Sequence, residues 1–182
     1  MFVRVENDSK MEVVVGGKGK PVLFISGFGF TALQWQEQFK NLTDKFMLIS
    51  INYPGIGLSE DIKDFTYEGI SNAFMKVLDL LGVQSSVNII GSSWGGIIAQ
   101  VIAKEFDHKV DKLILVGAFS EYKQNEDKSL RESLKDDFYN IGDYEGYEIL
   151  QNSEYSNRNI IPKYNIYAKD NYSTDHGYRS II

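Results

Sequence analysis

The chain has 182 residues, of which 43% are hydrophobic and 13% aromatic, so it can bury one sizeable core and we expect one domain with at most a subdomain. Its net charge is −6 and no basic cluster interleaves with aromatic residues, which argues against nucleic acid or an anionic membrane surface as a partner. The lack of cysteine excludes disulfides and thiolate metal sites. No apolar run has the length of a membrane span or the form of a signal peptide, so we expect a soluble, cytoplasmic protein without membrane insertion.

The first third of the chain alternates between short apolar runs and turn-forming residues. Two β-rich runs at residues 3–6 and 11–15 predict a hairpin around a polar loop. Residues 22–25 are apolar without alternation, as in a strand covered on both faces. Thr31 and Gln34 have the spacing of a capping box, and the apolar residues that follow predict a helix over about 32–42. Residues 46–51 predict the next strand, which ends in a turn rich in proline and glycine at 52–59.

The middle of the chain repeats this order. Apolar residues at helical spacing follow Ile70 and stop at Gly82, which suits the position just after a helix. Residues 87–90 predict a buried strand, the residues after Trp94 predict a helix, and residues 113–116 predict one more buried strand. Such alternation predicts an α/β fold with a mostly parallel sheet and helices on both faces, which binds its ligands at the carboxyl ends of the strands.

The sequence Gly91-Ser92-Ser93-Trp94-Gly95-Gly96 lies where the strand at 87–90 turns into a helix. A turn this tight requires glycine on both sides of the serine, because a Cβ atom would block the backbone or the approach of a substrate. The pattern G-x-S-x-G is that of a nucleophile elbow, in which the helix N-terminus points toward the hydroxyl group. We interpret Ser93 as a candidate catalytic nucleophile.

From Gly117 onward the composition changes, and this part holds nine of the eleven tyrosines of the chain. Short helices are predicted at 129–139 and 144–151. We expect a core of residues 1–119 and a polar, tyrosine-rich segment of residues 120–182. That segment is either a solvated cover over the sheet or a lid over the pocket.

Taken in order, these segments resemble the α/β-hydrolase fold over residues 2–119. The oxyanion loop of that family corresponds to Ser26-Gly27-Phe28-Gly29, its D-x-P-G-x-G-x-S turn to Asn52-Tyr53-Pro54-Gly55-Ile56-Gly57-Leu58-Ser59, and its elbow to the sequence around Ser93. The resemblance implies that Phe28 and Trp94 supply the two backbone N–H groups of an oxyanion hole. Ser26 replaces the usual histidine and Asn52 the usual aspartate.

The family's catalytic base and acid are harder to assign. Only two histidines exist, and His108 is expected at the edge of the sheet opposite Ser93, a strand length of roughly 17–20 Å away. His176 follows Ser93 in the family's chain order, and Asp170 and Asp175 are candidates for the acid, but the pattern favours the interpretation of all three as part of the lid or tail. Without further strands, residues 113–116 would form an exposed apolar edge, so the chain resembles the N-terminal part of a longer hydrolase.

The resemblance implies a serine hydrolase that acts on a small-molecule ester or thioester through an acyl-Ser93 intermediate, or an acyltransferase of the same fold. The alternative is a hydrolase-like binding or scaffold protein without a complete triad. Haloperoxidase and carbon–carbon hydrolase chemistry also occur on this fold, whereas dehalogenases use a carboxylate nucleophile. No metal or cofactor site is visible, and the oligomeric state stays open.

Overall fold

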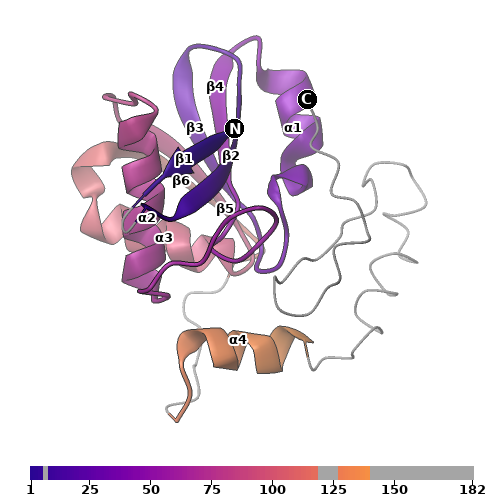
Figure 1. Ribbon diagram of the computed structural model, residues 1–182. Helices are drawn as coiled ribbons and strands as arrows, with labels where there is room; N and C mark the ends of the chain where they lie inside the picture. Colours follow the sequence, from indigo (N-terminus) through magenta and orange to yellow (C-terminus); the bar gives the residue numbers. More distant parts are fainter. Residues whose placement is uncertain (6–7, 119–126, 140–182) are drawn as a thin grey trace.

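The computed structural model describes residues 1–5, 8–118 and 127–139, which form a six-stranded sheet flanked by helices (Figure 1). The strand order is β1-β2-β4-β3-β5-β6. The bounds of the strands are Phe2–Arg4 (β1), Lys10–Gly16 (β2), Lys20–Ile25 (β3), Phe46–Ile51 (β4), Val87–Ser92 (β5) and Val110–Val116 (β6). The pairs β4–β3, β3–β5 and β5–β6 are parallel, whereas β1–β2 and β2–β4 are antiparallel. The predicted mostly parallel α/β sheet is confirmed.

The helices lie on both faces of this sheet, also as predicted. A 3₁₀ turn at Ala32–Trp35 leads directly into α1, Gln36–Leu42, on one face. On the other face lie α2, Tyr67–Leu80, and α3, Gly95–Glu105 (Figure 1). The Thr66 hydroxyl caps α2 by accepting a hydrogen bond of 3.0 Å from the Gly69 N–H, and Gly82 follows the helix with a φ of 75°. A fourth helix, α4, spans Leu130–Tyr139.

Strand β3 is covered on both faces, which explains its unbroken apolar sequence. Leu23 and Ile25 belong to the larger apolar cluster, which contains residues of α2 and α3. Val22 and Phe24 alternate with them and pack with Trp35, in a smaller cluster on the α1 side. Because side chains alternate across a strand, two clusters on opposite faces require apolar residues at every position.

Strand β6 pairs with β5 and has no second neighbouring strand among the described residues. Four consecutive apolar side chains on it are 38% to 49% exposed: Leu113, Ile114, Leu115 and Val116. The exposed apolar edge predicted for these residues is therefore present. Unpaired apolar edges promote association with other chains and are normally covered in folded proteins.

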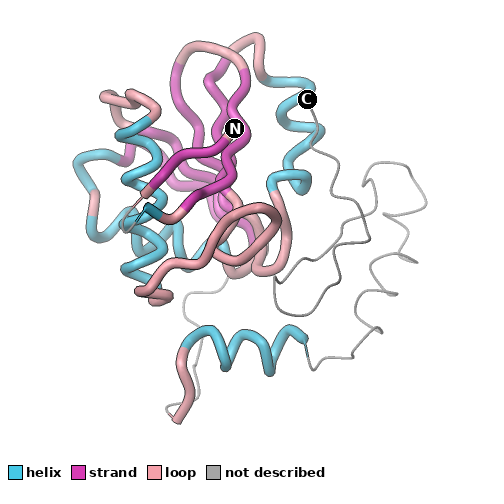
Figure 2. Tube along the Cα trace, viewed as in Figure 1, coloured by secondary structure: helices cyan, strands magenta, loops and turns pink. Residues whose placement is uncertain are grey.

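The loops that follow β3, β4 and β5 lie at the carboxyl end of the parallel strands, and α4 lies at the same end (Figures 1 and 2). Register places Ile25 of β3 opposite Gly91 of β5, so the loop after β3 and the turn after β5 begin side by side. A candidate site at this edge is thus built from segments that are distant in sequence, as expected for an open α/β sheet.

Candidate functional site

The turn at Ser93 joins β5 to α3 in a conformation that few residues adopt. Ser93 has a φ of 52°, in the left-handed region, which costs a residue with a Cβ atom about 1–2 kcal/mol. A Cβ atom on Gly91 would lie 2.6 Å from the Gly95 carbonyl oxygen, and one on Gly95 would lie 2.2 Å from the Ser26 carbonyl oxygen. Glycine is therefore required on both sides of Ser93, as the sequence predicts for an elbow.

Hydrogen bonds hold the backbone of this turn, whereas no described residue forms one with the hydroxyl group of Ser93. The Ser93 N–H donates to the Val116 carbonyl at 3.0 Å, and the Ser93 carbonyl accepts from the Gly96 N–H at 2.9 Å. Within residues 1–5, 8–118 and 127–139, no group forms a hydrogen bond with the Ser93 hydroxyl. Ser93 is half-buried, so part of the residue remains exposed.

The loop after β3 passes directly beside this turn. A methyl group on Gly27 would lie 3.5 Å from the Ser93 Cβ atom. Phe28, which follows Gly27, packs edge-on against Trp94 with ring centroids 5.3 Å apart. The backbone N–H of Trp94 stands at the N-cap of α3 and has no acceptor among the described residues. Phe28 and Trp94, the two residues predicted to donate backbone N–H groups to an oxyanion hole, are thus in contact.

A side-chain amide connects the same two segments. Gln34 Oε1 accepts a hydrogen bond from the Gly27 N–H at 3.0 Å, and Gln34 Nε2 donates to Ser92 Oγ at 3.1 Å. Sequence reasoning assigned Gln34 to a capping box with Thr31, whose hydroxyl accepts from the Leu33 N–H at 3.4 Å. No local pattern could have indicated the contact with Ser92, because 58 residues separate the two.

Asn52, which departs from the usual aspartate, forms a buried polar network with Glu12. The Asn52 Nδ2 group donates to Glu12 Oε2 at 2.7 Å, and the Leu58 N–H donates to the same oxygen at 2.9 Å. On its other side, Asn52 Oδ1 accepts from the Ala32 N–H at 2.7 Å. An aspartate at position 52 would lose the N–H donor and place a second carboxylate against Glu12. The carboxylate at position 12 therefore favours an amide at position 52.

Ser26, which replaces the usual histidine, forms hydrogen bonds through both its hydroxyl group and its carbonyl oxygen. Its hydroxyl accepts from the Trp35 indole N–H at 2.9 Å and donates to the Thr31 carbonyl at 3.2 Å. The Ser26 carbonyl accepts from the buried Tyr53 hydroxyl at 2.7 Å, and burial raises the pKa of Tyr53 well above its ordinary value. These bonds tie the start of the loop to Trp35 of the smaller apolar cluster and to Tyr53 of the larger one.

Comparison with known proteins decides the family. The model of the family described as alpha/beta hydrolase fold matches residues 20–144, more than half of the chain. The chain belongs to this family.

Two curated relatives and one solved structure show how far the similarity to this α/β hydrolase extends. Epoxide hydrolase 1 of Caenorhabditis elegans is 29% identical over 117 residues, which cover 62% of the chain and 29% of the relative. The poly(3-hydroxyalkanoate) depolymerase of Ectopseudomonas oleovorans is 29% identical over 118 residues, which cover 63% and 41%. A thermophilic esterase from Thermogutta terrifontis superposes with a TM-score of 0.64 at 24% identity, over 69% of the chain and 48% of the esterase. The chain therefore spans less than half the length of each of these proteins.

His108 does not contribute to the site of this α/β hydrolase. It lies in the 3₁₀ turn Asp107–Lys109 that precedes β6, whereas Ser93 follows the carboxyl end of the neighbouring parallel strand β5. The His108 side chain is 70% exposed and lies 3.6 Å from the Asp107 carboxylate. The prediction that it is a surface residue is confirmed. Asp170, Asp175 and His176 lie outside the described residues.

Helix α4 packs at the carboxyl end of the sheet, close to the site. Leu130 and Leu134 are buried in the larger apolar cluster. The Arg131 guanidinium pairs with the Asp61 carboxylate at 2.8 Å and lies 3.8 Å above the Phe65 ring. Helix α4 agrees with the helix predicted at 129–139, and the one predicted at 144–151 lies outside the described residues.

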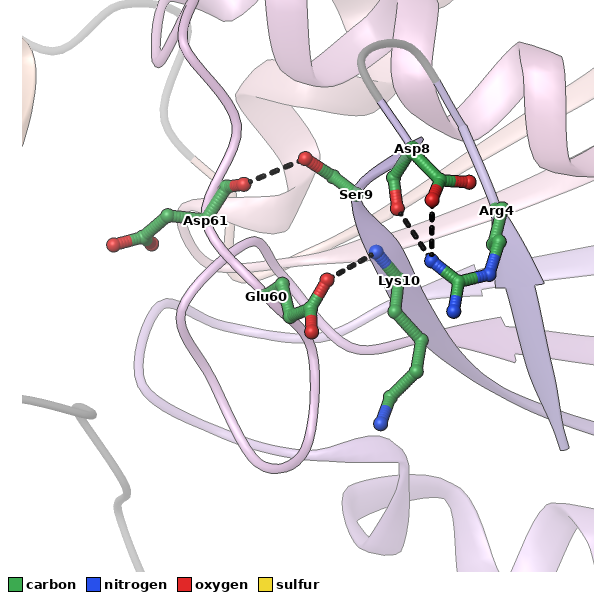
Figure 3. A network of polar contacts seen from close by, with 6 residues as sticks. All are labelled: Arg4, Asp8, Ser9, Lys10, Glu60 and Asp61. Atoms are coloured by element: carbon green, nitrogen blue, oxygen red, sulfur yellow. Dashed lines mark hydrogen bonds and ion pairs between the residues drawn. The ribbon is translucent and has the colours of Figure 1, made fainter.

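The segment that holds Asp61 is anchored in turn on the N-terminal hairpin (Figure 3). The Ser9 hydroxyl donates to the Asp61 carbonyl at 2.9 Å, and the Lys10 N–H donates to the Glu60 carboxylate at 2.9 Å. In the same view the Asp61 carboxylate points away from Ser9. Arg131, which the figure does not draw, pairs with this carboxylate. The segment after the Pro-Gly turn thus links the hairpin to α4.

The region beneath the elbow is aromatic with a few polar atoms. Trp94 packs against Tyr53 and Tyr67, with ring centroids 5.1 Å and 5.9 Å away. The indole N–H of Trp94, the Tyr67 hydroxyl and the Ser133 hydroxyl are buried without a hydrogen-bond partner among the described residues. Burial raises the pKa of Tyr67. The nearby Trp94 indole N–H, which does not reach hydrogen-bond geometry, lowers this pKa, and the Glu68 carboxylate raises it.

The described residues contain no group of three or more histidine, cysteine, aspartate or glutamate side chains suited to a metal ion. None of the described helices has the length and apolar character needed to cross a membrane.

Proposed function

We propose that the protein is a serine hydrolase that cleaves a small-molecule ester or thioester through an acyl-Ser93 intermediate. One observation carries the proposal: Ser93 is held at a strained φ of 52° beside the loop that presents Phe28, and no described residue forms a hydrogen bond with its hydroxyl group. Strain of this kind persists where the surrounding structure imposes it, and it concentrates at functional sites.

The proposed chemistry has two steps. Ser93 Oγ attacks the acyl carbon, its proton passes to a general base, and the carbon–oxygen or carbon–sulfur bond to the leaving group breaks as that group takes the proton. Water then attacks the acyl-Ser93 ester, releasing the acid and restoring the hydroxyl. In each step the carbonyl oxygen becomes negative, and the backbone N–H groups of Phe28 and Trp94 would stabilise it. Loss of one such donor typically costs about 2.7–4 kcal/mol of transition-state stabilisation.

The nucleophile type separates this proposal from epoxide opening. If a serine oxygen opened an epoxide, the product would be an ether, which water does not readily hydrolyse, so the enzyme could not turn over. Attack on an ester or thioester gives an acyl-serine ester, which water does cleave. Ser93 therefore favours ester or thioester substrates, although several relatives are named epoxide hydrolases. The likeness to a polyhydroxyalkanoate depolymerase is in keeping with ester cleavage.

Turnover measurements test the proposal. We expect the full protein to hydrolyse p-nitrophenyl esters or acyl thioesters, and Ser93→Ala to reduce kcat at least about 1,000-fold, because the nucleophile is absent. Ser85→Ala is the matched control, because Ser85 is an exposed serine before the start of β5. Product analysis with an added alcohol or thiol acceptor distinguishes hydrolysis from acyl transfer. Equal rates for Ser93→Ala and the unaltered protein would contradict the proposal.

One observation favours a second function, that of a hydrolase-like binding or scaffold protein. The Ser93 hydroxyl has no hydrogen-bonding base among the described residues, and His108 lies at the wrong end of the sheet. This alternative expects no turnover at any pH. It also expects ester analogues to bind with the same affinity before and after Ser93→Ala, which calorimetry can measure.

A further inference from the structure

The Gln34 side chain bridges the two segments that carry the candidate oxyanion donors. Its carbonyl oxygen holds the Gly27 N–H at 3.0 Å, and its amide nitrogen holds Ser92 Oγ at 3.1 Å. We propose that Gln34 is a positioning residue that sets the distance between the Phe28 and Trp94 N–H groups. This inference rests on the proposed function, because it concerns the oxyanion hole of that reaction.

The first end of the bridge controls the peptide group that carries the Phe28 N–H. Gly27 has its N–H bonded to Gln34 and its carbonyl oxygen bonded to the Phe30 N–H at 3.1 Å. The carbonyl of Gly27 and the N–H of Phe28 belong to one planar peptide unit, so fixing both sides of Gly27 fixes the direction of the Phe28 N–H. Glycine has no side chain that could pack and orient this peptide group, so we infer that these two hydrogen bonds set its orientation.

The second end is attached to the elbow. Ser92 is the last residue of β5 and lies two residues before Trp94. The next residue, Ser93, is fixed by Val116 and Gly96 through backbone hydrogen bonds of 3.0 and 2.9 Å. The elbow is thus a rigid unit on its own, and Gln34 links it to the oxyanion loop. Gln34 itself is held by the 3₁₀ turn Ala32–Trp35, whose Trp35 ring is buried against β3.

The chemistry of the bridge requires a neutral amide. One end must accept from a backbone N–H and the other must reach a hydroxyl, and a planar amide offers both at a fixed spacing. A carboxylate could bond both groups as well, since the Ser92 hydroxyl can donate, but it would place a negative charge beside the developing oxyanion. A glutamine keeps the geometry without that repulsion.

Three variants test the inference: Gln34→Met, which removes both hydrogen bonds with little change in shape; Ser92→Ala, which removes only the elbow end; and their combination. Misplacement of reacting groups by about 1 Å can cost 100-fold in rate, so we expect Gln34→Met to reduce kcat by about 10- to 100-fold with KM changed less than about two-fold. The kcat of the double variant should be no lower than that of Gln34→Met, because both single changes interrupt the same bridge. Gln38→Met, on the same helical segment, is the control and should retain full activity.

The pH dependence of a variant with a carboxylate at position 34 provides a second readout, which a purely structural role of Gln34 would not alter. Gln34→Glu should keep the bridge at neutral pH but lose activity, and its rate relative to that of the unaltered protein at the same pH should rise as the pH falls toward the carboxyl pKa of about 4.3. Gln34→Met should show no such recovery. A loss of activity in Gln34→Glu that is independent of pH would contradict the assigned position beside the oxyanion.

Amide hydrogen exchange separates failure of the bridge from failure of the proposed function. Gln34→Met should raise the exchange rate of the Gly27 N–H at least about 10-fold, because its acceptor is removed. If the Gly27 N–H exchanges at the same rate in Gln34→Met as in the unaltered protein, the hydrogen bond from Gly27 to Gln34 is contradicted, whatever the activity of the variant. Faster exchange with an unchanged kcat overturns the positioning role while leaving the hydrolase proposal intact. If the unaltered protein turns over no ester or thioester, the proposed function fails and the positioning role fails with it.

Discussion

The Asn52 side chain, directly after β4, donates a buried hydrogen bond of 2.7 Å to the Glu12 carboxylate on β2. The same Asn52 amide accepts from the Ala32 N–H, which begins the 3₁₀ turn after the oxyanion loop. One residue therefore connects the N-terminal hairpin, the Pro-Gly turn and the segment that carries Gln34. Asn52 thus replaces the usual aspartate at a position where Glu12 supplies a carboxylate that accepts its hydrogen bond.

We expect Asn52→Asp to destabilise the fold by about 1.5–3 kcal/mol, because it removes a charge-assisted hydrogen bond and opposes two buried carboxylates. Adding Glu12→Gln should restore a large part of this loss, since an amide and a carboxylate would again face each other with exchanged roles. Urea unfolding of the two single variants and the double variant measures the coupling. Strictly additive changes in unfolding free energy would contradict the network.

The strain at Ser93 predicts an unusual order of stability. Ser93→Gly should be about 1 kcal/mol more stable than Ser93→Ala, because glycine adopts a φ of 52° without the steric cost of a Cβ atom. Thermal unfolding of the two variants makes the comparison, and neither retains the hydroxyl group. If Ser93→Ala proved the more stable of the two, the left-handed turn would be in doubt.

Arg131 is expected to hold α4 against the segment around Asp61. Its side chain is 26% exposed and that of Asp61 is 47% exposed, so the ion pair contributes no more than about 1 kcal/mol, and the contact with Phe65 adds about 0.5–1 kcal/mol. Arg131→Ala should therefore speed amide exchange within α4 while leaving β3 and β5 protected. Lys104→Ala is the control, because the Lys104 side chain is 80% exposed. Unchanged exchange in α4 would show that Leu130 and Leu134 suffice to hold it.

The Lys20 ammonium at the start of β3 bonds the Asp111 carboxylate at the start of β6 and lowers the pKa of Asp111 below its ordinary value. A carboxyl group with a lowered folded-state pKa stabilises the fold above its unfolded pKa and loses that contribution as the pH falls through the folded value. Lys20→Met should move the Asp111 pKa upward. A carboxyl-carbon NMR titration measures this shift, and an unchanged midpoint would contradict the pairing.

The parts of the fold that depend on local pattern could be predicted from the sequence. The unbroken apolar run at Val22–Ile25 indicated a strand between two layers, and the glycines around Ser93 indicated a turn that no Cβ atom tolerates. The contacts of Gln34 and Asn52 could not be predicted in this way. Their partners lie 58 and 40 residues away, and only the completed sheet brings them together.

The assignment of a catalytic base was limited for a different reason. Elimination of His108 followed from topology alone, since a residue before β6 lies at the end of the sheet opposite the end of β5. Asp170, Asp175 and His176 remain predictions, as does the division into a core of residues 1–119 and a lid of residues 120–182. The described part of that segment, α4, covers the carboxyl end of the sheet and is consistent with either a cover or a lid.

The central claim is that Ser93 is a nucleophile, and covalent labelling followed by peptide mapping tests it most directly. A fluorophosphonate probe forms a phosphorus–oxygen bond with an activated serine and releases fluoride. We predict one adduct on the full protein, located on the peptide that contains Ser93, absent from Ser93→Ala and present in Ser85→Ala. Equal labelling of Ser93→Ala and the unaltered protein, or no adduct on the unaltered protein, would contradict the account.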